Sequence, residues 1–145
     1  MRGLDTNILV RLLTADDPEQ AEAVLRLVEI VESAGGRLHV SNIVLVELVW
    51  VLRGGRYAFS RVEVADALGA LLDSMVFEIQ DRDLVRRAAA AFRIGPADFS
   101  DYLIGEHDRR AGCTATLTFD RRLAGSRGFE ELDTGSSYPT QVSEP

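Results

Sequence analysis

Met1-Arg-Gly-Leu-Asp-Thr-Asn-Ile-Leu-Val-Arg-Leu-Leu13 is the stretch from which the fold of this chain is predicted. A short apolar run ends at Asp5, and an apolar run with helical spacing follows it. The acid therefore stands at a predicted strand-to-helix junction. In an open α/β sheet, ligands bind beyond the carboxyl ends of the strands, so a charge at this junction is placed for chemistry.

Length and composition indicate one globular domain. The 145 residues are 46% hydrophobic and 27% charged, and no apolar run reaches the roughly 20 residues of a membrane span. At this length roughly 68–70% of the unfolded surface can be buried. The beginning of the chain lacks the pattern of a secretory signal, and the single Cys113 cannot form an internal disulfide. We therefore expect a cytoplasmic protein that does not enter a membrane.

The net charge of −7 argues against a protein that coats nucleic acid through clustered basic residues. All 16 basic residues are Arg, the side chain suited to bidentate phosphate contacts, although genome composition explains the same bias equally well. An acidic protein can still bind RNA when its carboxylates gather around metal ions that reverse the local field.

Alternation of predicted strands and helices indicates an α/β fold with a central, mainly parallel sheet of four or five short strands flanked by helices. Residues 1–132 form the predicted domain, and residues 133–145, rich in Ser, Thr and Pro, are expected to be a flexible polar tail. Helices are expected over 8–14, 18–33, 43–52, 60–73, 81–92 and 99–111, and further strands over 37–40, 75–79, 114–119 and 129–132.

Glu47 is the only charged residue in the apolar run 43–52, which is long for a strand and follows a Ser-Asn cap. Burying a carboxylate is costly unless it is paired, protonated or bound to a metal. A buried Glu47 would need such a partner; an Arg salt bridge or a position at the rim of the core is the alternative to a metal.

Asp98 and Asp101 lie three residues apart at the start of a predicted helix, which places them on one side of it. Asp98 is the better candidate for the N-cap, and Asp101 is open to either dipole stabilisation or a ligand role. Asp120 ends a predicted strand, as Asp5 does, so both acids are expected on the same edge of the sheet. Carboxylates without a cluster of His or Cys suit Mg²⁺ or Mn²⁺.

Four segments of the chain resemble the PIN-domain family, and within it the VapC toxins of bacterial toxin–antitoxin pairs. They are Leu4-Asp-Thr-Asn-Ile-Leu-Val10, Ser41-Asn-Ile-Val-Leu-Val-Glu-Leu48, Asp98-Phe-Ser-Asp-Tyr-Leu-Ile-Gly105 and Leu117-Thr-Phe-Asp120. The resemblance implies a PIN-like domain that cleaves RNA with the help of Mg²⁺ or Mn²⁺, an antitoxin protein that occludes the site, and a homodimer. It implies metal-holding roles for Asp5, Glu47, Asp101 and Asp120, and accessory roles for Asp98, Thr6, Asn7 and Thr118.

Sequence proximity to the expected rim of this site suggests Arg contacts with RNA phosphates, from Arg53, Arg56, Arg121 and Arg122. Two other functions fit parts of the pattern. A haloacid-dehalogenase-like phosphatase also begins with an Asp after a strand, but it requires a second acid two residues on, where this chain has Asn7. A non-catalytic protein-binding module would not depend on the acids at all.

Overall fold

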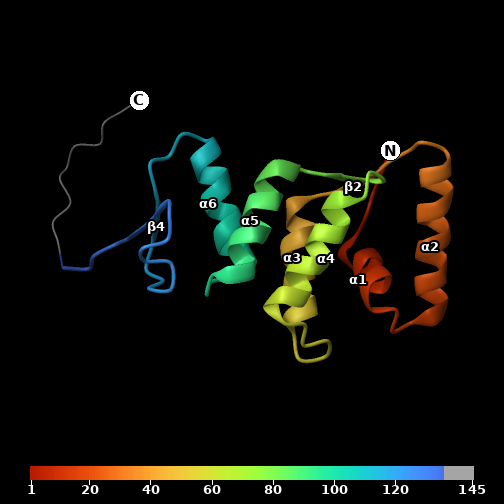
Figure 1. Cartoon of the computed structure of the whole chain (residues 1–145), viewed down its shortest axis with the longest axis horizontal. Helices are drawn as coiled ribbons and strands as arrows, with labels where there is room; N and C mark the ends of the chain where they lie inside the picture. Colours follow the sequence, from red (N-terminus) through yellow and green to blue (C-terminus); the bar gives the residue numbers. More distant parts are fainter. Residues whose placement is uncertain (136–145) are drawn as a thin grey trace.

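A computed structural model describes residues 1–135, in which six helices alternate with five short strands (Figure 1). This arrangement confirms the α/β fold class. The polar tail predicted over 133–145 lies mostly outside the described residues. The strands are β1 (Arg2–Gly3), β2 (Leu38–Val40), β3 (Phe77–Ile79), β4 (Thr116–Thr118) and β5 (Phe129–Glu131). The helices are α1 (Thr6–Thr14), α2 (Pro18–Ser33), α3 (Asn42–Arg53), α4 (Arg61–Asp73), α5 (Arg82–Ile94) and α6 (Phe99–Arg110).

Strand pairing is parallel throughout the described residues, as expected, but it forms two sheets in place of the single sheet that we predicted. Strands β1, β2 and β3 lie in that order, with Gly3 beside His39 and His39 beside Glu78. Strands β4 and β5 form a separate pair. The two sheets lie toward opposite ends of an elongated molecule, with α5 and α6 between them (Figure 1).

Local signals in the sequence account for most helix starts. Asp17 accepts a hydrogen bond from the backbone N–H of Gln20, and Pro18 occupies the first turn of α2, where its missing N–H costs nothing. Ser60 and Glu63 close a full capping box at α4. These contacts are local, so the predicted starts of these helices agree with the structure.

The hydrophobic core lies between the three-stranded sheet and the helices α1, α3, α4, α5 and α6, and it includes Leu123 from the loop after β4. Its largest side chains include the fully buried Phe92 and Phe99, whose rings meet edge to face with centroids 6.4 Å apart. In strand β2, Leu38 and Val40 are buried. No helix within residues 1–135 is both long and apolar enough to cross a membrane.

Candidate active site

Asp5 follows β1 at the carboxyl edge of the three-stranded sheet, where it caps α1 by accepting a 2.6 Å hydrogen bond from the backbone N–H of Thr6. Helix α3 begins at the same edge, because Ser41 follows the parallel strand β2 and accepts a hydrogen bond from Val44 N–H. The register of β1 and β2 therefore places Asp5 beside the start of the helix that carries Glu47.

Helix α3 is apolar on two faces, which corrects the expectation that its apolar run encloses Glu47. Leu45, Leu48, Val49 and Leu52 are buried, whereas Glu47 shares the solvent side with Ile43, which is 79% exposed, and Trp50, which is 59% exposed. Within residues 1–135 neither Asp5 nor Glu47 forms a salt bridge. Glu47 avoids the cost of burial by remaining in water, so no buried partner is required.

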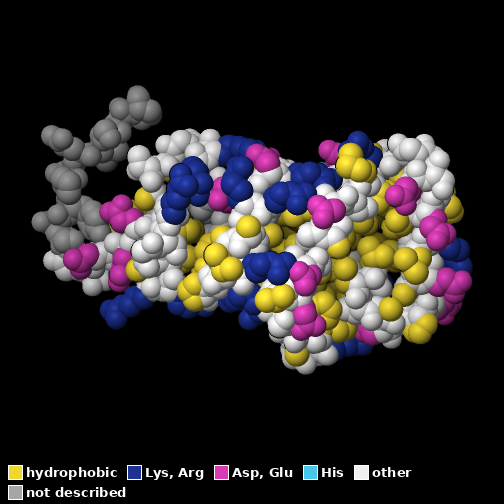
Figure 2. All heavy atoms as spheres, in the orientation of Figure 1, with side chains coloured by type: hydrophobic (Ala, Val, Ile, Leu, Met, Phe, Trp, Pro, Cys, Tyr) yellow, Lys and Arg dark blue, Asp and Glu magenta, His cyan; other side chains and the backbone are white. Residues whose placement is uncertain are grey.

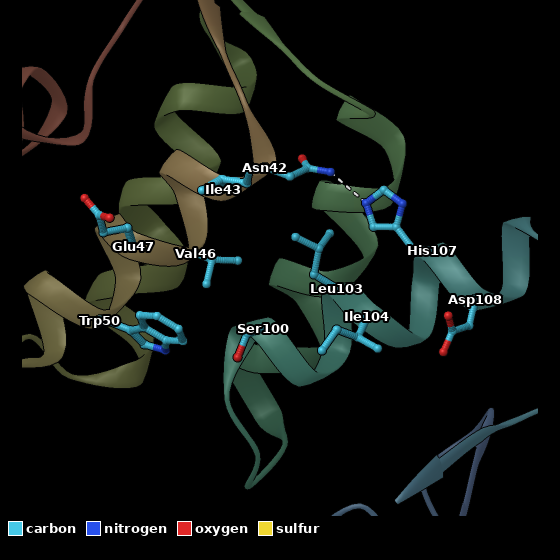
Figure 3. Close-up of a pocket in the computed structure, with 10 residues that line it drawn as sticks. All are labelled: Asn42, Ile43, Val46, Glu47, Trp50, Ser100, Leu103, Ile104, His107 and Asp108. Atoms are coloured by element: carbon cyan, nitrogen blue, oxygen red, sulfur yellow. Dashed lines mark hydrogen bonds between the residues drawn. The ribbon is translucent and has the colours of Figure 1, made fainter.

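An apolar cleft of about 610 Å³ separates α3 from α6 (Figure 3). Trp50 and Ile104 line its walls, and one end is bridged by a 2.7 Å hydrogen bond between Asn42 Nδ2 and His107 Nε2. Glu47 lies at the edge of the cleft with its carboxylate pointing away from α6 (Figure 3).

Asp98 and Asp101 stand together at the start of α6. Asp98 occupies the N-cap with extended backbone angles, and its N–H donates a 3.0 Å hydrogen bond to Asp101 Oδ2. Asp98 is exposed and Asp101 is half-buried. The predicted division of roles, with Asp98 as the cap, agrees with this geometry; the predicted ligand role of Asp101 stays a prediction.

Asp120 follows β4 and is held by Arg122. The guanidinium donates to both carboxylate oxygens at 2.7–3.1 Å, and the Arg122 backbone N–H donates a further bond at 2.9 Å. These side-chain and backbone hydrogen bonds lower the pKa of Asp120. The same contacts raise the pKa of Arg122, with further contributions from Asp98 and Asp101. Asp98, Asp101 and Asp120 therefore all lie close enough to interact with the charge of Arg122.

The four principal acids divide into two groups, on two parts of the chain that face each other across the cleft between α3 and α6. Asp5 and Glu47 belong to the part that contains β1 and α3, and Asp101 and Asp120 belong to α6 and the loop after β4. The expected shared edge of β1 and β4 is not formed, since these strands belong to different sheets. The reason is that, within residues 1–135, β4 pairs with β5 alone.

The chemistry of the donor set suits Mg²⁺ or Mn²⁺, because all four principal residues offer carboxylate oxygens. The geometry within one chain does not suit a metal ion. Among residues 1–135, no three His, Cys, Asp or Glu side chains are placed so that they could hold one. A single chain in this conformation therefore does not assemble the predicted metal site.

The accessory residues lie beside the acids. Thr6 is buried next to Asp5, and Asn7 is exposed in the first turn of α1. Thr118 Oγ1 accepts a 3.0 Å hydrogen bond from Asp120 N–H. Thr6 and Thr118 thus each sit one hydrogen bond away from a predicted metal-holding acid.

The Arg residues predicted to contact RNA differ in their surroundings. Arg56 forms a 2.8 Å ion pair with Asp16, and Arg122 forms an ion pair with Asp120. Arg53 lies over the ring of Phe92, and Arg121, whose side chain is 89% exposed, has only a 3.6 Å contact with Glu131. Of these side chains, Arg121 is the most accessible to a phosphate.

Arg61 was not recognised from the sequence. It stacks over Phe92 at 4.4 Å and donates to the carbonyl oxygens of Ala97 and Pro96, which fixes the loop before α6. Burial and the charge of Arg53 lower its pKa. No local pattern could reveal these contacts, because they join residues more than thirty positions apart in the chain.

The cleft residues Ile43, Trp50 and Ile104 were also missed as surface features. Their spacing was visible in the sequence, but an apolar residue in a helix is usually assigned to the core. Only the position of Glu47 among them gave a signal, since a charge on the same helical face as Ile43 and Trp50 marks that face as solvent-accessible.

Comparison with known proteins gives two matches that cover most of the chain. The sequence model of the PIN domain matches residues 4–126. A protein named VapC ribonuclease from Aquifex aeolicus (strain VF5) is 25% identical over 133 residues, a stretch that covers 92% of this chain and 96% of that protein. All four principal acids lie within the matched segment. The chain belongs to the PIN domain family.

Proposed function

We propose that the chain is a metal-dependent endoribonuclease that acts as the toxin of a VapBC-type toxin–antitoxin pair. The observation that carries this proposal is the placement of the acids: Asp5, Glu47, Asp101 and Asp120 all fall within residues 4–126, the segment matched by the PIN domain. Likeness over nearly the full length to a protein named as a ribonuclease supports RNA as the substrate class.

The four carboxylates are the proposed acids on which phosphodiester hydrolysis depends, and Mg²⁺ or Mn²⁺ is the proposed metal because it prefers oxygen ligands. Thr6, Asn7, Thr118 and Asp98 are proposed as supporting residues. The alternative phosphatase has less support, since Asn7 occupies the position where that class requires an acid.

Proposed contacts with RNA phosphates involve Arg residues on the side of the C-terminal acids. Arg53 and Arg122 both lie close enough to Arg61 to affect its pKa. Together with the exposed Arg121, they form a cationic border beside Asp98 and Asp120. Arg56 keeps its proposed role only if RNA displaces its ion pair with Asp16.

An antitoxin protein and a second copy of the chain are the proposed protein partners, and the cytoplasm is the proposed location. The exposed apolar side chains of α3 and α6 offer one surface for the antitoxin. Copurification of a small protein expressed from the same operon, with loss of RNA cleavage in the complex, would support this assignment.

The test of the proposed activity uses purified chain, free of any bound protein, with RNA and with a phosphomonoester, each in EDTA and in millimolar Mg²⁺. We expect RNA cleavage only with the metal. Asp5→Asn and Asp101→Asn should each reduce the rate by at least about 100-fold, the lower range for loss of a group acting in the transition state.

Asp73→Asn is the matched control, because Asp73 is an exposed acid on α4 whose surface ion pair with Arg86 contributes little to stability. Its rate should equal that of the wild-type protein. Hydrolysis of the phosphomonoester without RNA cleavage would favour the phosphatase. Full RNA cleavage by both active-site variants would exclude the proposed acids.

A further inference from the structure

Among residues 1–135, each half of the candidate site lies beside a strand edge that carries no partner. In the three-stranded sheet, β1 pairs with β2 on one side only, and Asp5 follows β1. In the second sheet, β4 pairs with β5 on one side only, and Asp120 follows β4. Free strand edges present unpaired backbone N–H and C=O groups that can accept a further strand.

The β4–β5 pair is more exposed than a parallel sheet normally is. Parallel sheets are usually covered on both faces, and two strands alone are marginally stable in water. Here Leu117 is 58% exposed and Phe119, two residues on, is 67% exposed. These exposed apolar side chains, within β4 and directly after it, indicate that this region is covered in the functional form.

The β4–β5 pair is firmly joined to α6, which prevents a simple hinge between them. Thr116 Oγ1 donates a 2.7 Å hydrogen bond to Asp108, and the ring of Phe129 packs edge to face on Tyr102. Gly105 allows this approach, since a Cβ there would lie 2.6 Å from Phe129 Cζ. In turn, α6 packs along α5, so β4 moves only with these helices.

The two free edges lie in different parts of the same elongated chain, β1 with the first sheet and β4 at the far end (Figure 1). The same separation divides the acids. We therefore propose that two copies of the chain exchange their C-terminal parts, so that β4 of one copy pairs in parallel with β1 of the other. Each active site then takes Asp5 and Glu47 from one copy, and Asp101 and Asp120 from its partner.

Parallel pairing of β4 with β1 brings the acids of the two copies to the same edge of one sheet. Strands that run side by side in parallel end at the same edge, so Asp120 after β4 comes next to Asp5 after β1. The exchange is reciprocal, which gives two identical contacts and closes the assembly as a dimer. It also resolves the mismatch between a donor set that suits a metal ion and a single chain that does not assemble it.

Charge supports a second copy as the occupant. Asp5 and Glu47 have no salt bridge within the described chain, and the incoming part carries the exposed Arg121 directly after Asp120. In Figure 2 the Arg side chains on the visible face gather over α5 and α6, and acidic side chains lie at both ends of the molecule. Reciprocal pairing of β4 with β1 brings Arg121 of one copy toward Asp5 of the other.

The first test measures mass in solution and does not depend on activity. We expect wild-type protein to be a dimer of the 15.9 kDa chain by light scattering. Leu117→Ser should shift the protein to monomers, whereas Leu25→Ser should remain dimeric, because Leu25 is similarly exposed, at 51%, but lies on α2. A monomeric wild-type protein, or a dimer broken by Leu25→Ser and kept by Leu117→Ser, would overturn the exchange.

The second test rests on the proposed ribonuclease function and uses complementation. Chains carrying Asp5→Asn and Asp120→Asn are coexpressed with different tags, and mixed dimers are purified through both tags. A mixed dimer contains one site with both substitutions and one with neither. We expect each variant alone to be inactive and the mixed dimer to recover about half of the wild-type rate, one site of two in a closed dimer.

No recovery in the mixed dimer, with active wild-type protein, would show that each site comes from a single chain and would overturn the exchange. Circular dichroism of each variant checks that it is folded. If wild-type protein cleaves no RNA under any condition, the proposed function fails, and the mass comparison of Leu117→Ser with Leu25→Ser still decides the exchange.

Discussion

The two sheets of this protein contain the same kind of strand in opposite surroundings. Strand β2 has Leu38 and Val40 buried at 1% and 0% exposure beneath helices, whereas Leu117 of β4 is 58% exposed. Both strands are three residues long and parallel to their neighbours. The difference in exposure therefore depends on the segments that cover each strand. The four acids are divided between the same two parts of the chain.

This comparison shows where the fold derives its stability. The N-terminal part encloses a continuous core, so its half of the site rests on a rigid support. The C-terminal part joins that core through Phe99, Tyr102 and Leu103 of α6 and through Leu123, and β5 is attached by the ring of Phe129. Its half of the site is positioned by fewer buried contacts.

The largest effect should come from removing a core side chain. Leu45→Ala empties a fully buried position on α3 and should cost about 2–5 kcal/mol of unfolding free energy. Leu117→Ala, the same change on exposed β4, should cost less than about 0.5 kcal/mol at low protein concentration. Urea titration followed by circular dichroism measures both.

The free-energy cost of Leu117→Ala should also depend on protein concentration. If a second copy covers β4, the cost of Leu117→Ala should grow as protein concentration rises, because association stabilises the wild-type chain by mass action. If Leu45→Ala and Leu117→Ala reduced the free energy of unfolding equally at the lowest protein concentration, the proposed difference in burial between the two sheets would be wrong.

A smaller effect is expected where β5 meets α6. In Gly105→Ala the new Cβ would lie 2.6 Å from Phe129 Cζ, so the ring must move, at a cost of about 1–3 kcal/mol. Gly69→Ala is the matched substitution on α4, where nothing lies within 4 Å of the new Cβ. It should stabilise the protein by about 0.5–1 kcal/mol, because Ala loses less backbone entropy than Gly in a helix.

Opposite signs for these two Gly→Ala substitutions in thermal unfolding would confirm the close contact between α6 and β5. A gain in stability for Gly105→Ala would show that β5 does not pack on α6 as described. Tryptophan fluorescence of Trp50, on α3, provides a probe that neither substitution touches.

The smallest effect concerns the pH response of Asp120. Hydrogen bonds from Arg122 lower its pKa in the folded chain, so they stabilise the folded state above the unfolded-state pKa near 3.8. This contribution is lost as pH falls through the lowered folded-state pKa. Arg122→Ala should return the Asp120 pKa toward its ordinary value, which NMR titration of the carboxyl carbon measures.

An unchanged Asp120 pKa in Arg122→Ala would mean that the contact between these side chains is not kept in solution. Asp16 is the internal reference in the same spectrum. Its pKa is lowered chiefly by the Tyr57 hydroxyl, a contact at 2.6 Å far along the chain from Arg122, so Arg122→Ala should leave it unchanged.

Much of the local structure could be predicted from the sequence because it depends on neighbours in the chain. The capping box of Ser60 and Glu63 and the Asp17-Pro18 start of α2 each involve residues within three positions of one another. The placement of Asp5 at a strand-to-helix junction is equally local. The same holds for the pairing of Asp98 with Asp101 at the start of α6.

The exposed face of α3 could not be predicted from the apolar residues of the run 43–52, in which Glu47 was the single signal of orientation. The pairing of β4 with β5, and not with β1, could not be predicted either. A strand of three residues has too few side chains for their pattern to determine which strand it pairs with. The contacts that determine the pairing join residues far apart in the chain.

By itself, the sequence determined the order of helices and strands, most helix caps, and the positions of Asp5, Asp101 and Asp120 near the ends of these elements, because hydrogen bonds and side-chain contacts between near neighbours specify them. Only the tertiary structure decided which face of α3 meets water, that the strands divide into two sheets, and that Asp5 and Asp120 lie in different parts of one chain. Those features depend on packing between distant segments, which no local pattern encodes.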